Sequence, residues 1–170
     1  MRDKKNLTVD MVKDFHRYVM LGALPKYCGL FRDHEVRVLG ASFKPAQPWD
    51  IPGKVSALVD WFNQKSTTHP IENASIFHAA FDTIHPISDG NGRTGRLLMN
   101  YMLVKAGYWP VNIRYAEDRL RYYDALSEFN KTGKADALTT LVAKRAKDQL
   151  DYCIHIARQK DLVRLVGIER

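Results

Sequence analysis

The sequence predicts an all-α fold that carries one small β-hairpin flap. Apolar residues recur at helical spacing in several segments, and glycines and prolines separate these segments. One short β-prone run, residues 36–40, stands alone and is followed by Pro45 and Pro48, which a helix would not tolerate. Because an isolated hairpin cannot make a stable sheet of its own, we expect the flap to lie at the edge of a helical body.

The length and composition are typical of one soluble globular domain, residues 1–170. Hydrophobic residues make up 45% of the chain, charged residues make up 26%, and no apolar run is long enough to cross a bilayer. The opening residues do not resemble a secretory signal, and Cys28 and Cys153 lie far apart, as expected of unpaired thiols in a reduced compartment. We therefore expect a cytoplasmic protein with no membrane partner, and delivery into a host cell stays open.

The formal charge of +7 could favour an acidic protein or a nucleic acid as a partner. No basic run with interleaved aromatic residues and no nucleic-acid-binding motif occurs in the sequence. A solvated basic surface is the simpler interpretation, so nucleic-acid binding is the least favoured function.

Each expected helix follows from an apolar stripe and from the residues that break it. The first covers residues 8–21, where Thr8 can cap the first turn and Gly22 ends the pattern. The second begins at Pro52 and carries apolar residues at i, i+3, i+4 and i+7 from Val55. A third runs from about residue 71 to residue 84.

Later segments place the expected centre of the fold. Pro86 disfavours helical backbone at the preceding residue, so the third helix should end at or near His85. Residues 97–104 are apolar almost all round, as in a buried central helix. Another helix is expected over residues 117–130. From Asp136 onward a long amphipathic run is expected to bend or split near residue 158.

Residues 85–96, with the sequence HPISDGNGRTGR, hold most of the side chains suited to chemistry. Gly90 and Gly92 permit positive φ and close backbone approach, so successive N–H groups can converge on an anion at the positive end of the next helix. Arg93 and Arg96 are three residues apart, and their guanidinium groups suit phosphate oxygens. The turn therefore predicts a phosphate site.

A carboxylate and a histidine accompany this turn. One hard carboxylate beside a polyphosphate is the usual way to hold Mg²⁺, which makes Asp89 a candidate metal ligand. His85 has an ordinary pKa of about 6.5, which suits the removal of a hydroxyl proton. Each residue alone is more often part of a capped turn between helices. Their joint occurrence before a buried helix favours the functional interpretation.

This stretch resembles the signature of the Fic family, H-x-F-x-[D/E]-G-N-G-R-x-x-R. It departs only at Ile87, where the family usually has Phe as an apolar anchor of the loop. Further landmarks of the family are Gly29-Leu30-Phe31-Arg32, His69-Pro70, Arg96-Leu97-Leu98-Met99-Asn100 and Ala106-Gly107-Tyr108. The resemblance covers a core of about residues 8–145, which leaves a C-terminal helical extension over residues 146–170.

The resemblance implies a Mg²⁺-dependent protein adenylyltransferase, which transfers AMP from ATP to a Ser, Thr or Tyr hydroxyl of a target protein and releases pyrophosphate. His85 would be the catalytic base, and Asp89 would hold the metal. The turn amides and the Asn91 side chain would cradle the phosphates. The full set of ATP- and phosphate-binding residues carried over from the motif is Asp89, Gly90, Asn91, Gly92, Arg93, Thr94, Gly95 and Arg96.

Two further groups of residues resemble family positions. The flap residues Val36, Arg37, Val38 and Leu39 would dock the target segment by strand-like pairing. Tyr122, Tyr123 and Asn130 resemble positions around the adenine and ribose. For these three, ordinary packing of helix aromatics and a helix-end asparagine is an equally good interpretation, so both stay open.

The sequence contains no convincing match to the inhibitory helix that controls many members of this family. Many Fic proteins are inhibited by a helix with the pattern [S/T]-x-x-x-E-[G/N], and residues 68–73 match it only through a run interrupted by Pro70. An antitoxin-like inhibitory chain is therefore one candidate partner, and a segment preceding this chain is another candidate source of the inhibitory glutamate. A third alternative is that the activity is not inhibited in this way. Two alternative functions stay open: a Fic-fold nucleotide-binding or docking module without turnover, and transfer of a different phosphate-containing group.

Overall fold

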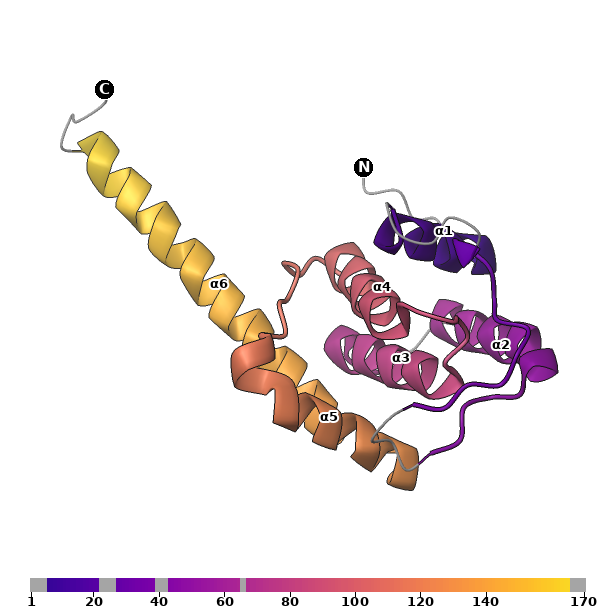
Figure 1. The fold of residues 1–170 in the computed structure, drawn as a ribbon. Coiled ribbons are helices and arrows are strands. Elements are labelled where there is room, and N and C mark those ends of the chain that lie inside the picture. Colours follow the sequence, from indigo (N-terminus) through magenta and orange to yellow (C-terminus); the bar gives the residue numbers. More distant parts are fainter. Residues whose placement is uncertain (1–5, 22–26, 39–42, 65–66, 166–170) are drawn as a thin grey trace.

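The computed structural model describes residues 6–21, 27–38, 43–64 and 67–165. Its elements in chain order are α1 (Val9–Val19), a 3-10 turn η2 (Pro48–Asp50), α2 (Ile51–Asn63), α3 (Pro70–Ile84), α4 (Asn91–Lys105), α5 (Tyr115–Thr132) and α6 (Asp136–Leu165). The described ranges contain no β-strand, so the described architecture is all-α, as predicted (Figure 1).

The helices α3 and α4 form the centre of the molecule. In Figure 1, α1 and α2 lie on one side of this pair, and α5 and the first part of α6 lie on the other. Phe77 and Phe81 of α3 are completely buried and stack with their ring centroids 6.5 Å apart. Leu98 and Met99 of α4 are also completely buried. Burying a side chain of this size stabilises the fold by about 1.5–3 kcal/mol.

The local sequence explains where α3 begins and why α4 can approach it closely. Pro70 occupies the first turn of α3, where its missing N–H is not needed, and the His69 ring accepts the Ile71 N–H at 3.3 Å. A Cβ on Gly95 of α4 would lie only 2.6 Å from Nδ1 of His78 on α3. Glycine at this position therefore permits the close approach of the two helices.

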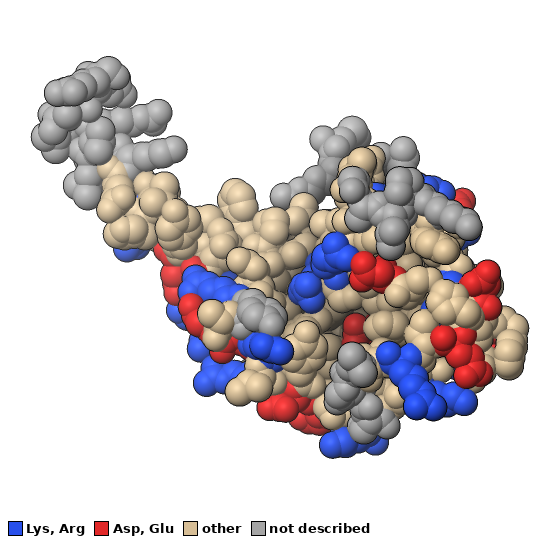
Figure 2. Space-filling view, viewed as in Figure 1, with Lys and Arg blue, Asp and Glu red and all other residues tan. Residues whose placement is uncertain are grey.

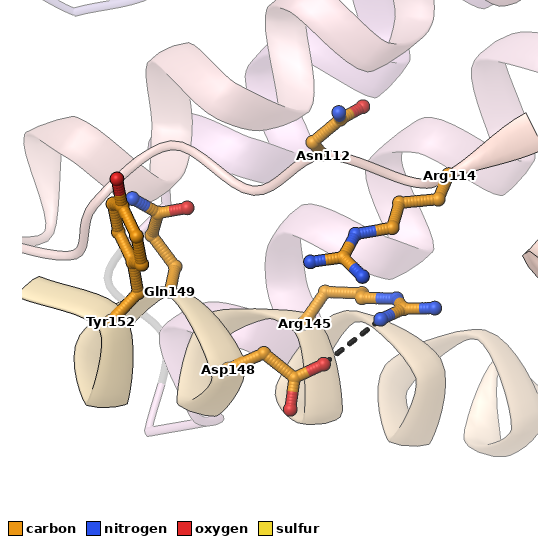
Figure 3. A pocket seen from close by; sticks show the side chains of 6 residues that line it. All are labelled: Asn112, Arg114, Arg145, Asp148, Gln149 and Tyr152. Carbon is orange, nitrogen blue, oxygen red and sulfur yellow. Dashed lines mark hydrogen bonds and ion pairs between the residues drawn. The ribbon is translucent and has the colours of Figure 1, made fainter.

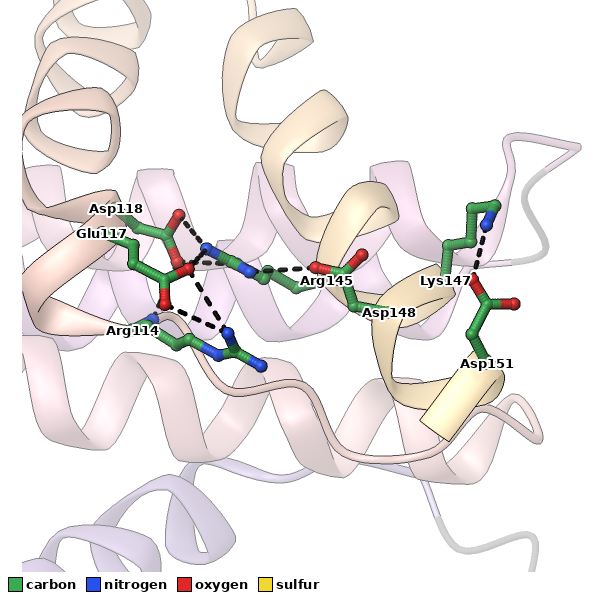
Figure 4. A network of polar contacts seen from close by, with 7 residues as sticks. All are labelled: Arg114, Glu117, Asp118, Arg145, Lys147, Asp148 and Asp151. Atoms are coloured by element: carbon green, nitrogen blue, oxygen red, sulfur yellow. Dashed lines mark hydrogen bonds and ion pairs between the residues drawn. The ribbon is translucent and has the colours of Figure 1, made fainter. Parts of the chain in front are cut away.

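The C-terminal helices are fastened to each other by a buried charge network. Arg145 of α6 pairs with Asp118 of α5 at 2.6 Å, and both side chains are almost completely buried. The same guanidinium reaches Glu117 at 2.8 Å and Asp148 at 2.9 Å (Figure 4). The bonds to Arg145 are the largest cause that lowers the pKa of Asp118, which keeps that carboxylate charged.

Two predicted features differ from the described structure. The C-terminal run is one unbroken helix past residue 158, because its residues from Asp136 to Leu165 contain neither proline nor glycine to interrupt the hydrogen bonding. The predicted hairpin flap is not formed as paired strands in the described residues, where residues 35–38 have no regular secondary structure. Leu39 lies outside the described residues. None of the described helices is both long and apolar enough to span a membrane.

Candidate active site

His85 ends α3 in a left-handed backbone conformation, with φ 50° and ψ 57°. Among the described residues, His85 is the single residue other than glycine that has a positive φ. Such a conformation is uncommon for a residue with a Cβ. Its N–H donates to Phe81 O at 3.0 Å, and its carbonyl accepts from Arg32 Nε at 2.8 Å. These bonds hold the backbone of His85 from both sides.

The ring of His85 has one nitrogen engaged by the protein. Nδ1 lies 3.2 Å from the carbonyl oxygen of Asp82, one turn earlier on α3. Because a carbonyl can only accept, Nδ1 carries the proton and Nε2 keeps a lone pair in the neutral ring. Burial is the main cause that lowers the pKa of His85, the Asp82 carbonyl opposes it, and the charge of Arg32 lowers the pKa further. The ring is therefore neutral at pH 7, with a lone pair on Nε2 that can accept a proton.

The turn after His85 is held by Asn91, the first residue of α4. Asn91 Oδ1 accepts from the Ile87 N–H at 3.0 Å, and Asn91 Nδ2 donates to the Ile87 carbonyl at 2.6 Å. The side chain of Asn91 is buried, and these two bonds direct it to the backbone of Ile87, so it shapes the loop. Its predicted contact with the phosphates stays a prediction. Ile87 itself is buried, as its role of apolar anchor requires.

The glycine turn leads directly into α4. Gly90 precedes the helix with φ 87°, and a Cβ there would meet Met20 Sδ at 3.2 Å. The first N–H groups of a helix have no intrahelical acceptor, so the amides of Asn91, Gly92 and Arg93 offer donors at the positive end of α4. This end of the helix suits an anion.

Asp89 and Arg93 lie together at the mouth of the turn. Their side chains form an ion pair at 3.1 Å, and the Asp89 side chain is 62% exposed. No group of three or more His, Cys, Asp or Glu side chains that could hold a metal occurs in the part of the chain that the structure describes. A lone exposed carboxylate fits a Mg²⁺ ion that is bound mainly through phosphates and water. Asp89 would contribute one carboxylate oxygen to such an ion.

Arg96 is placed by a chain of side chains from three helices. Its Nη1 donates to Tyr122 Oη at 3.3 Å, and its guanidinium lies over the Tyr122 ring at 5.7 Å. Tyr122 Oη also bonds to Nε2 of His78, at 2.7 Å. Burial lowers the pKa of His78 to about 3 and raises the pKa of Tyr122, so both groups are neutral supports for the one charge of Arg96.

Three of the predicted ligand-binding residues face the interior. Thr94 is completely buried, and Gly95 packs against His78. Tyr122 is only 5% exposed, and its hydroxyl accepts a hydrogen bond from Arg96. The structure does not bring these residues to the surface that carries Asp89, because the α3–α4 and α3–α5 contacts use them for packing.

Tyr123 and Asn130 differ from Tyr122 in their surroundings. The Tyr123 side chain is 55% exposed and meets the Tyr122 ring edge-on at 5.4 Å. Asn130 Oδ1 accepts from the Thr83 hydroxyl at 2.7 Å, and Asn130 Nδ2 donates to the Leu126 carbonyl at 2.9 Å. Tyr123 therefore presents a free aromatic surface, and Asn130 ties α5 to the end of α3.

The described part of the flap borders a hollow. Its lining consists of Glu35, Val36, Arg37, Val38, Phe43, Lys44 and Pro45, and its volume is about 550 Å³. A second pocket of about 220 Å³ lies at the junction of α5 and α6, lined by Asn112, Arg114, Arg145, Asp148, Gln149 and Tyr152 (Figure 3). The second pocket contains no residue of the motif, and its arginines already pair with carboxylates.

Sequence reasoning missed two residues that build the site. His78 lay in an apolar stripe with no signal that distinguished it from the core. Arg32 was noted only as a landmark, although a charged residue between Phe31 and the flap was a usable signal. On the face that Figure 2 shows, basic and acidic side chains are interspersed among the described residues.

Comparison with known proteins identifies the family of the chain. The Fic/DOC family model matches residues 6–103. Protein adenylyltransferase Fic from Nematostella vectensis is 39% identical over 132 residues, which cover 76% of this chain and 30% of the relative. Protein adenylyltransferase fic-1 from Caenorhabditis elegans is 34% identical over 155 residues, which cover 90% of this chain and 30% of the relative.

The similarity extends to three dimensions. A solved structure of Fic-1 from C. elegans matches with a TM-score of 0.80 and 31% identity, over 91% of this chain and 45% of that chain. The chain spans about 30% of the length of the curated relatives it matches. The family resemblance predicted from residues 85–96 is confirmed: this chain belongs to the Fic/DOC family.

Proposed function

We propose that this chain transfers AMP from ATP to a Ser, Thr or Tyr hydroxyl of a target protein. The observation that carries the proposal is the neutral ring of His85, with Nδ1 bonded to the Asp82 carbonyl and Nε2 free to accept a proton. The relatives named protein adenylyltransferase, at 34–39% identity, support the same chemistry.

The reaction needs one proton transfer and one displacement. His85 Nε2 takes the proton of the acceptor hydroxyl, whose oxygen attacks the α-phosphorus of ATP. The bond from the α-phosphorus to the bridging oxygen breaks, and pyrophosphate leaves. Such a transfer depends on positioning and on charge stabilisation, and the protein has no other covalent step to perform.

The α4 end of the site supplies the positive charge for this transfer. The amides of Gly90, Asn91 and Gly92 face the phosphates, and Arg93 and Arg96 neutralise their outer oxygens. Asp89 would hold a Mg²⁺ ion bound with the nucleotide, and that ion would offset negative charge on the phosphates. Arg93 then exchanges its ion pair with Asp89 for the phosphate.

The flap is the proposed docking site for the target. Val36, Arg37 and Val38 line the hollow of about 550 Å³ without belonging to a helix or strand, so their backbone is available to pair with an extended segment of a target. The predicted hairpin, Leu39 included, would then be completed by the bound target. An antitoxin-like chain that presents a glutamate to Arg96 remains the proposed inhibitory partner.

Paired labelling tests this function. The chain is incubated in a cell lysate with Mg²⁺ and ATP labelled either at the α-phosphate or at the γ-phosphate. We expect protein-bound label from the α-position only. Label from the γ-position that appears only when this chain is added would identify a kinase instead, and nucleotide binding with no added label from either position would identify a binding module without turnover.

A further inference from the structure

Arg32 is a buried arginine whose guanidinium is bonded to backbone carbonyls. The side chain is 3% exposed. Nε donates to His85 O at 2.8 Å, Nη1 donates to His34 O at 2.6 Å, and Nη2 donates to Ala46 O. Its own N–H donates to the Pro86 carbonyl at 3.0 Å. One side chain thus joins the motif loop to both limbs of the flap, since His34 precedes the flap tip and Ala46 follows it.

A contribution to the stability of the fold does not by itself explain why the buried side chain at position 32 is charged. In the described part of the chain no carboxylate lies within ion-pair distance of Arg32, and Glu35 is the acidic group whose charge acts on it. Burial is the main cause that lowers the pKa of Arg32, so removing this charge from water is unfavourable. An apolar side chain would fill the space without this cost, but it could not hold three carbonyls at once.

We propose that Arg32 is a positioning residue that fixes the distance between the catalytic histidine and the flap that docks the target. The inference rests on the proposed function. The planar guanidinium directs its donors to fixed points, so the backbone of His85 cannot move without moving the flap limbs at His34 and Ala46. A target strand paired with the flap therefore presents its hydroxyl at a set distance from His85 Nε2.

The same residue acts on the proton affinity of the base. The groups that face His85 are the Asp82 carbonyl, which favours the protonated ring, and the Arg32 cation, which disfavours it. Because a positive charge next to an imidazolium is unfavourable, Arg32 helps to keep the ring neutral and ready to accept a proton. Two substitutions separate the positioning of the backbone from the effect of the positive charge. Arg32→Lys keeps the charge but loses the forked guanidinium that bonds to three carbonyls, and Arg32→Met loses both.

Two measurements by NMR need no turnover. The first is the pKa of the His85 ring, and the second is hydrogen exchange at the Ala46 N–H, which donates to Ile84 O at 3.3 Å. We expect both variants to accelerate exchange at Ala46 by about tenfold or more, since the flap limb loses its tie. We expect the His85 pKa to rise in Arg32→Met and to stay unchanged in Arg32→Lys. Arg158→Met, an exposed residue on α6, is the matched control and should change neither.

A third measurement connects positioning to the reaction. Protein labelling from α-labelled ATP should fall about 10- to 100-fold in both Arg32 variants, while the dissociation constant for ATP stays as in the wild type. If the wild type labels nothing, the proposed function fails, and the two NMR measurements still decide the role of Arg32. If Arg32→Met does not fold, Arg32→Lys carries the test. A folded variant with wild-type exchange at Ala46 and an unchanged rate would overturn the proposal.

Discussion

His85 combines a strained backbone with a ring that is ready to act as a base. A left-handed conformation costs a residue with a Cβ roughly 1–2 kcal/mol, so its surroundings must hold it there. Phe81 and Arg32 do so through the two bonds to the His85 backbone. Pro86 predicted that α3 would end at this residue, and the structure confirms it. The left-handed turn was not predictable, since it depends on Arg32, 53 residues earlier.

The lowered pKa of His85 predicts the pH dependence of transfer. The neutral ring is the active form, so the rate should be at its plateau above the pKa and fall as pH falls through it. Since burial and Arg32 lower this pKa below 6.5, the midpoint should lie on the acidic side of 6.5. Initial rates of α-label incorporation across pH check this, with ATP affinity measured at each pH as the control. A midpoint above 6.5 would contradict the assignment of the base.

The adjacent residues Tyr122 and Tyr123 should differ in their contribution to ATP binding. Tyr123 presents its ring to solvent, whereas Tyr122 is buried beneath Arg96. Stacking of a base on an aromatic side chain contributes about 1–3 kcal/mol, so Tyr123→Ala should weaken ATP binding by that amount. Titration calorimetry with ATP measures the change. Leu120→Ala, 77% exposed on the same helix, is the matched control, and an equal loss in both variants would show that Tyr123 does not contact the base.

At the scale of elements, the close packing of α3 on α4 aligns the site. It sets Arg96 of α4 against Tyr122 and His78, and the short loop between the helices carries the turn at Gly90. The apolar spacing predicted these helices well, because a continuous buried stripe at helical period is a strong signal. Their approach across Gly95 was not predictable from spacing, since it depends on the shape of the partner helix.

Gly95→Ala should therefore destabilise the molecule. Its Cβ would lie 2.6 Å from His78 Nδ1 and 2.9 Å from His78 Cε1, so either the buried His78 ring or one of the two helices must shift. We expect a loss of about 1–3 kcal/mol in the free energy of unfolding, measured with urea. Gly53→Ala is the matched control, because its Cβ would meet nothing within 4 Å inside α2. That change should stabilise the protein by about 0.4–1 kcal/mol. Equal effects of the two substitutions would contradict close packing at Gly95.

The attachment of α6 to α5 depends on Arg145. Arg145→Met leaves the carboxylate of Asp118 buried without its partner, which should lower the free energy of unfolding by about 3 kcal/mol or more. Urea unfolding measures the loss. Lys147→Met breaks the exposed pair with Asp151 on the same helix and should have little effect. A small effect of both changes would show that the network does not hold these helices together.

At the scale of the whole molecule, the site is assembled from four parts of the chain. Hydrogen bonds join the end of α3 to Arg32 and Ala46 beside the flap and to Asn130 of α5, and the motif loop joins it to the start of α4. The helix α6 extends away from the other helices (Figure 1). The motif chemistry could be predicted because its residues are neighbours in sequence. The bonds that join Arg32 to His85 and His78 to Tyr122 could not, since they cross 53 and 44 residues with no local pattern. The unpaired flap shows the same limit, because an extended run without a partner strand has little stability of its own.

One measurement tests the central claim most directly: mass spectrometry of lysate proteins after incubation with ATP, Mg²⁺ and either the wild-type chain or His85→Asn. Asparagine tolerates the left-handed backbone of His85, so the fold and nucleotide binding should persist without the base. We predict an adduct of AMP less water on Ser, Thr or Tyr side chains with the wild type, reduced at least about 100-fold in the variant. An adduct of a single phosphate, or equal amounts of the AMP adduct with both proteins, would contradict the account.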